Sequence, residues 1–124
     1  MKIHESAEMY LETILILTNK SKEVRMIDVA NEMNYSKPSV SVFLKDLREN
    51  GYLESDKNGF LSLTESGRAI AERIYDRHQS ITKFLVALGV DEETAAADAC
   101  KMEHDISDKT YEAMKEHYNK HRRD

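Results

Sequence analysis

The stretch from residue 26 to residue 63 constrains the fold most, because signals for two short helices and a hairpin follow one another there almost without a gap. Apolar residues at helical spacing predict a helix over 26–33, and Pro38 is well placed in the first turn of a second helix. The pair Asn58-Gly59 lies between short runs of strand-type residues and predicts a hairpin turn. Two helices joined by a tight turn form a helix-turn-helix. With a hairpin directly behind it, the stretch predicts a winged helix-turn-helix.

The rest of the chain is predicted to be helical. Apolar residues recur at helical spacing over 5–19 and over 65–88. Two shorter helices are expected to begin at the caps Asp91 and Ser107, and the first of them to run through about His104. The expected fold class is therefore mainly α with a small β-hairpin wing, a winged helix-turn-helix followed by a helical domain.

Two domains that share the long helix are expected, a winged helix-turn-helix over 1–70 and a helical domain over 71–124. No apolar run reaches the roughly 18–20 residues that a membrane span needs, and the start of the chain lacks a signal-peptide core, so no membrane association is expected. The single cysteine, Cys100, fits a reducing cytoplasm. The net charge of −5 argues mildly against a nucleic-acid partner unless something, such as a bound divalent cation, offsets it.

The sharpest chemical feature is a Cys-x-x-Glu-His pattern formed by Cys100, Glu103 and His104. Residues at i, i+3 and i+4 share one face of a helix, and thiol, carboxylate and imidazole all bind transition metals. The same spacing also fits a buried cysteine beside a surface glutamate and histidine, so the pattern alone leaves both interpretations open. A catalytic thiol would need a base, an orienting group and an oxyanion hole. The sequence offers no glycine-rich loop or nucleophile elbow for these, which argues against an enzyme.

Small hydroxyls and amines gather where the second helix of the helix-turn-helix begins. Such groups contact phosphates and base edges of DNA, although an ordinary solvated helix face is the alternative. Their place at the start of the second helix of a helix-turn-helix, ahead of a wing, favours the DNA interpretation. The candidate DNA-binding residues are Ser36, Lys37, Pro38, Ser39, Ser41 and Lys45.

Five segments spread over nearly the whole chain carry a family pattern. They are residues 8–14, 36–41, 63–67, 77–78 and 98–108. Together they resemble the diphtheria-toxin-repressor family of metal-dependent transcriptional regulators, which includes iron-dependent repressors and manganese transport regulators. The implied layout is the two-domain form without the SH3-like third domain of longer members.

The resemblance implies a primary metal site formed by Met9, Cys100, Glu103 and His104. The iron-responsive branch of the family has methionine and cysteine at the first two of these positions, where the manganese branch has carboxylates. Thioether and thiolate are softer ligands and suit Fe²⁺, Co²⁺, Ni²⁺ or Zn²⁺ better than Mn²⁺. Fe²⁺ is therefore the expected metal, with Mn²⁺ as the alternative.

A second metal site is implied only in part. His78 matches a family ligand, and Glu12 matches a carboxylate that the manganese branch pairs with it. The further ligands of the iron branch fall at Thr82 and Ala96, which do not supply them. The chain is thus expected to combine an iron-like primary site with a half-formed manganese-like second site.

The implied function is a homodimeric repressor of metal-homeostasis genes that binds a palindromic DNA operator. A cation with ligands from both lobes would tie them together and set the spacing of the paired recognition helices. The apolar candidates for the dimer contact are Ile106, Tyr111, Met114 and residues 84–88. The alternative is a winged-helix module that binds other proteins and no regulatory metal. The acidity of the chain fits this alternative, whereas its ligand-type residues speak against it.

Overall fold

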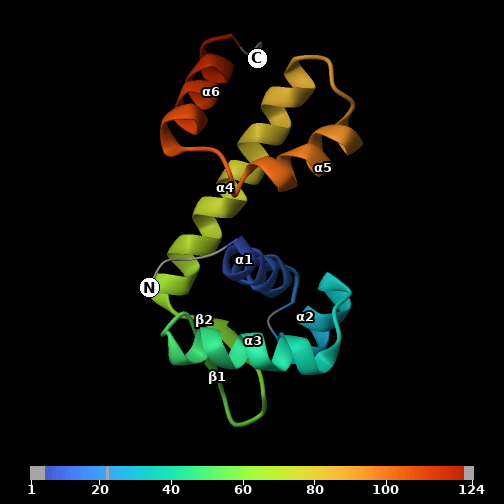
Figure 1. Ribbon diagram of the computed structural model, residues 1–124, viewed down its shortest axis with the longest axis vertical. Coiled ribbons are helices and arrows are strands. Elements are labelled where there is room, and N and C mark those ends of the chain that lie inside the picture. The colour runs from blue at the N-terminus through green and yellow to red at the C-terminus, as the bar shows by residue number, and fades with distance from the viewer. Residues whose placement is uncertain (1–4, 22, 122–124) are drawn as a thin grey trace. The chain divides into compact units, whose positions relative to one another are not determined.

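The computed structural model describes residues 5–21 and 23–121 and is largely helical (Figure 1). It divides into two compact units, Met1–Glu72 and Arg73–Asp124. The elements in chain order are α1 (Glu5–Lys20), α2 (Met26–Met33), α3 (Lys37–Glu49), β1 (Leu53–Ser55), β2 (Leu61–Leu63), α4 (Glu65–Ala87), α5 (Glu92–Met102) and α6 (Asp108–His121). This confirms the predicted fold class, a winged helix-turn-helix followed by a helical part.

The helix-turn-helix is built by local signals at the ends of α2 and α3. Asn34 ends α2 in the left-handed conformation, with φ of 58°, which asparagine tolerates better than most residues. Ser36 caps α3, because its hydroxyl accepts a hydrogen bond from the backbone N of Ser39. One face of α3 is buried in the first unit through Val40 and Leu44, together with Leu47 one turn later. That burial fixes which face of α3 stays in water.

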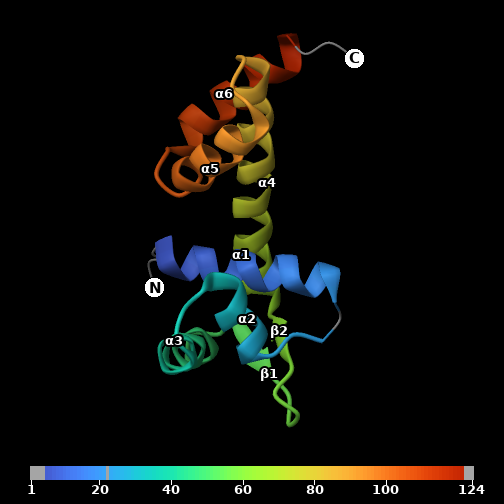
Figure 2. The same cartoon turned by 90° about the vertical axis from the view of Figure 1, so that its right-hand side faces the viewer.

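The wing is a two-stranded antiparallel hairpin in which Leu53 pairs with Leu63. Its turn is closed by Asp56, whose Oδ1 accepts hydrogen bonds from the backbone N of Asn58 and of Phe60. Gly59 follows with φ of 83°, a conformation that glycine adopts without steric cost. Figures 1 and 2 both show the hairpin loop extending past α3. The predicted hairpin turn is thus confirmed.

The start of α4 is joined tightly to the end of the helix-turn-helix. The hydroxyl of Thr64 accepts a hydrogen bond from the backbone N of Gly67 and donates one to the carbonyl O of Gly51, at 2.7 Å. Gly67 is buried, and a Cβ placed on it would lie 2.0 Å from the carbonyl O of Tyr52. Only glycine allows this approach of two backbone segments.

The second unit has a small core of its own, formed by Ile81 of α4, Ala99 of α5 and Tyr111 of α6. Ile106 and Met114 are partly buried against this core. Tyr111 is only 5% exposed, so its expected role in a dimer contact is wrong. Its apolar ring completes the core of its own unit, where burial keeps it from a second chain. Exposed apolar surface lies instead at the end of α4, where Val86 and Leu88 are 43% and 64% exposed.

Hydrogen bonds to Asp76 of α4 add to this packing. The Tyr111 hydroxyl donates to Asp76 Oδ2 at 2.5 Å, and Lys115 Nζ lies 3.3 Å from the same oxygen. The hydrogen bond from Tyr111 lowers the pKa of Asp76, while burial raises the pKa of Tyr111.

Within the described ranges, no helix is both long enough and apolar enough to cross a membrane.

Candidate metal centre and DNA-binding face

The Cys-x-x-Glu-His pattern lies where α5 ends. The helix stops at Met102, slightly earlier than expected, and Glu103 is its C-cap, with its backbone N bonded to the carbonyl O of Ala99. The side chains do not share one environment as the spacing suggested. Cys100 is exposed, Glu103 is 0% exposed, and the His104 side chain is 1% exposed. The Glu103 carboxylate and the His104 imidazole are thus buried, whereas Cys100 is an exposed residue.

Glu103 lies between two imidazoles within the second unit. Its Oε2 lies 2.9 Å from Nδ1 of His78, and its Oε1 lies 3.3 Å from Nε2 of His104. A buried carboxylate is costly unless it is paired or coordinates a metal, and carboxylate with imidazole is a frequent donor set for divalent transition metals. The donor chemistry therefore fits a metal ion, and the structure brings His78 to the same carboxylate as His104.

The remaining predicted ligands belong to α1 of the first unit. Met9 is half-buried, and its carbonyl O accepts a hydrogen bond from the Thr13 hydroxyl at 2.8 Å. Glu12, one turn after Met9, is buried with 9% exposure. A buried carboxylate on a helix of a small domain is uncommon unless it has partners or a role. Met9 and Glu12 are thus one helical turn apart on the same helix.

Two positions at which the iron branch has further ligands are filled differently. The Thr82 hydroxyl donates to the carbonyl O of His78 at 2.7 Å, one turn back along α4. Ala96 has only a methyl group. The structure therefore offers His78, but neither Thr82 nor Ala96, as a ligand.

The six candidate DNA-binding residues at the start of α3 are all exposed. They are Ser36, Lys37, Pro38, Ser39, Ser41 and Lys45. Pro38, Ser41 and Lys45 follow one another at helical spacing on the side of α3 opposite its buried residues. The Ser36 hydroxyl also donates to the Ser39 hydroxyl at 2.9 Å, so these two side chains are already ordered at the helix start.

One residue of this face was missed by sequence reasoning. Val42 is 71% exposed in the middle of α3, next to Ser41 and one turn before Lys45. An apolar side chain on a surface of this kind can contact the methyl group of thymine. Its spacing from Pro38 could have revealed it, because the two residues are four apart on one helix face.

Both parts of the chain match models of known protein families. The family model described as iron dependent repressor, N-terminal DNA binding domain, matches residues 2–61. The model described as iron dependent repressor, metal binding and dimerisation domain, matches residues 64–124. The two models together cover almost the whole chain.

Individual relatives agree with the family models. An uncharacterized HTH-type transcriptional regulator of Methanocaldococcus jannaschii is 36% identical over 90% of this chain and 90% of its own length. The transcriptional regulator MntR of Escherichia coli is 36% identical over 90% of this chain and 72% of its own. The structure of the manganese regulator SloR matches with a TM-score of 0.79 and 28% identity, over 96% of this chain. The chain spans 55% of that structure's length. It belongs to the iron-dependent repressor family of metal-dependent transcriptional regulators.

Proposed function

We propose that the chain is a cytoplasmic, homodimeric repressor that binds a palindromic operator when a divalent metal is present. The observation that carries the proposal is the buried Glu103 carboxylate, which contacts the imidazoles of His78 and His104. The same chain exposes the candidate DNA-binding residues of α3. The proposed division of labour is DNA binding by residues 1–70 and metal binding and dimerisation by residues 71–124.

We assign the primary metal ligands to Met9, Cys100, Glu103 and His104, and a possible second site to Glu12 and His78. When bound, the metal supplies positive charge and a cross-link between its ligands. Glu103 contributes a buried negative charge that favours a cation, and the imidazole of His104 must be neutral to bind it. Cys100 must lose its thiol proton to act as a ligand. Metal affinity is therefore expected to fall as the pH is lowered.

Charge supports the need for such a cation. The chain has a net charge of −5, and DNA repels acidic protein surfaces. A bound divalent ion offsets part of this charge. Because the assigned ligands come from α1 and from the end of α5, the arrangement of the two units would also depend on the metal. That arrangement would set the spacing of the paired recognition helices, as the proposal requires.

The proposed metal is Fe²⁺, with Mn²⁺ as the alternative. Met9 and Cys100 contribute sulfur donors, which favour Fe²⁺, Co²⁺, Ni²⁺ or Zn²⁺ over the harder Mn²⁺. The similar structure of SloR points the other way, since SloR is described as a manganese regulator. The side chains at positions 9 and 100 are therefore the ones proposed to set the preference between Fe²⁺ and Mn²⁺.

Replacing Met9 by Asp and Cys100 by Glu together tests this assignment. Both changes substitute a hard oxygen donor for a soft sulfur, so the preference is expected to move toward Mn²⁺. The variant should fold, because Cys100 is exposed and Met9 only half-buried. The measurement is the concentration of Fe²⁺, handled without oxygen, and of Mn²⁺ that gives half-maximal DNA binding.

The control is a double variant with the same change of charge at exposed positions, Ser6→Asp and Ala113→Glu. Ser6 lies on α1, as Met9 does, and Ala113 lies on α6, the helix that follows α5. The ratio of Fe²⁺ to Mn²⁺ activation of this control should equal that of the wild type. A Met9→Asp, Cys100→Glu protein with the same ratio as this control would show that the two sulfur residues do not set metal selectivity.

A further inference from the structure

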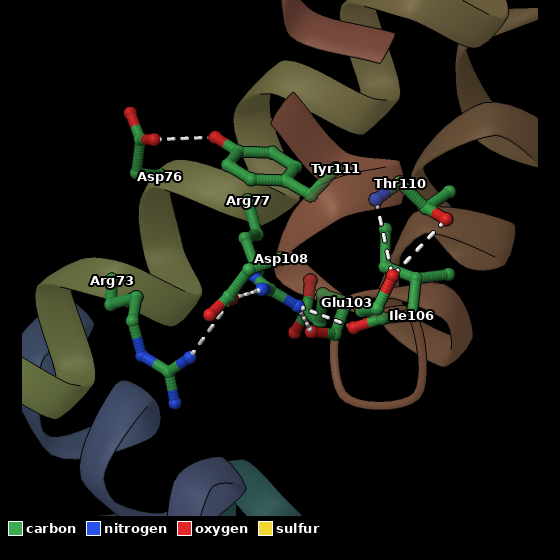
Figure 3. Close-up of polar contacts among 9 residues, drawn as sticks. Arg73, Asp76, Arg77, Glu103, Ile106, Asp108, Thr110 and Tyr111 are labelled. Atoms are coloured by element: carbon green, nitrogen blue, oxygen red, sulfur yellow. Dashed lines mark hydrogen bonds and ion pairs between the residues drawn. The ribbon is translucent and has the colours of Figure 1, made fainter. Parts of the chain in front are cut away.

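A buried arginine next to His78 holds the connection between α5 and α6. Arg77 of α4 is 4% exposed. Its Nη1 donates to the carbonyl O of Glu103 at 3.2 Å and to that of Ile106 at 3.0 Å, and its Nη2 contacts the carboxylate of Asp108 (Figure 3). One side chain thus ties the C-cap of α5, the following turn and the first residue of α6 to α4.

The chemistry of this contact is specific to arginine. A guanidinium carries five N–H donors in a rigid planar fork, so it can serve two carbonyls and a carboxylate at once. A lysine ammonium is a single compact charge and lacks that fork. The last carbonyls of a helix have no partners within the helix and carry the negative end of its dipole, which favours a cation there. The ring of Tyr111 lies 5.0 Å from the guanidinium and covers it.

Adjacent residues of α4 therefore hold the same acidic residue in two ways. Arg77 bonds to the backbone of Glu103, while His78 contacts its side-chain carboxylate. Asp108 in turn keeps the guanidinium oriented, and Arg73 Nη1 lies 3.8 Å from the same Asp108 oxygen. The backbone of the turn from which Glu103 and His104 project is thus anchored to α4.

We infer that Arg77 is a positioning residue for the metal centre, an inference that rests on the proposed function. Arg77 fixes the backbone of Glu103, so that the Glu103 carboxylate and the His104 imidazole are held ready for a cation. Preorganised ligands bind more tightly because less conformational freedom is lost on binding. Metal affinity should therefore depend on Arg77, although Arg77 itself binds no metal.

The test compares Arg77→Lys with wild type in the full-length protein, using Co²⁺ and Mn²⁺ as probes. Loss of a group that orients a metal ligand typically weakens metal affinity by about 10–100-fold, and the same loss is expected here. The visible absorption of bound Co²⁺ should shift, because the ligands are held less uniformly. DNA binding at saturating metal should stay close to that of the wild type.

A second variant covers the case in which Arg77→Lys does not fold. Asp108 is 82% exposed, so Asp108→Asn should fold while it weakens the hold on the guanidinium. It is expected to reduce Co²⁺ and Mn²⁺ affinity in the same direction and by less. The matched control is Tyr111→Phe, which removes the hydrogen bond to Asp76 in the same unit and leaves the hydroxyl-free ring in place. Its melting temperature should fall while its metal affinity stays unchanged.

The inference is overturned if Arg77→Lys and Asp108→Asn lower the melting temperature as Tyr111→Phe does, yet bind Co²⁺ and Mn²⁺ with wild-type affinity and spectrum. If Arg77→Lys fails to fold, wild-type metal binding by Asp108→Asn alone has the same meaning. A wild-type protein that binds neither metal would instead refute the proposed function, so the two failures are distinguishable.

Discussion

Replacing Glu103 by Gln is expected to abolish metal-dependent DNA binding at metal concentrations that saturate the wild type. Glutamine has nearly the same shape but no negative charge, and a neutral amide is a poor ligand for a divalent transition metal. Replacing a residue that only orients a ligand typically lowers metal affinity by about 10–100-fold. Loss of this carboxylate, a proposed ligand, should therefore lower metal affinity by at least about 100-fold. Calorimetric titration with Mn²⁺ and Co²⁺ measures the affinity, and fluorescence anisotropy measures DNA binding.

The fold of this variant should survive, because the side-chain amide can still hydrogen-bond to His78, whose Nδ1 lies 2.9 Å from the Glu103 carboxylate. Glu112→Gln, at an exposed position of α6, is the control with the same change of charge. Equal metal affinity of the Glu103→Gln and Glu112→Gln proteins would remove Glu103 from the metal centre.

Replacing Gly67 by Ala is expected to destabilise the first unit strongly. The added Cβ would lie 2.0 Å from the carbonyl O of Tyr52, and that oxygen belongs to the backbone. Either the hairpin or the start of α4 must move, and overpacking of this kind costs about 3 kcal/mol. The melting temperature should fall by about 10 °C, as measured by circular dichroism.

Gly59→Ala separates steric conflict from backbone strain. Gly59 has φ of 83°, but nothing lies within 4 Å of a Cβ at this position. Its cost should be that of one residue held in the left-handed region, about 1–2 kcal/mol. A Gly67→Ala protein no less stable than Gly59→Ala would show that the close approach to Tyr52 is absent in solution.

The parts of the fold that depend on neighbouring residues were predictable from the sequence. The cap Ser36 with Pro38 marks the start of α3, and Thr64 marks the start of α4, because caps act within one helical turn. Asn58-Gly59 likewise marks the turn of the wing. Each of these signals is read from a few adjacent residues.

The details of the candidate site depend on tertiary packing and were less predictable. Spacing placed Glu103 and His104 with Cys100, but whether each is buried depends on how α4 and α5 pack in the second unit. Tyr111 was predicted as a dimer contact but is buried in its own unit. Apolar residues at helical spacing predict a buried helix face, but they do not show whether the same chain or a second chain covers it. The contact of Arg77 with residues 26 to 31 positions away in sequence leaves no local signal at all.

In the proposed function, a divalent metal controls DNA binding by this chain. The most direct measurement is the anisotropy of a labelled duplex, selected from a random-sequence pool by the wild-type protein with Mn²⁺ or, without oxygen, Fe²⁺. Affinity is then compared with and without the metal, using a chelator and a fixed salt concentration. Coupling between two sites is typically worth about 5–150-fold, so affinity should rise at least about tenfold with metal. Equal affinity in the chelator, or no duplex enriched at all, would contradict the account and favour a winged-helix module that binds other proteins.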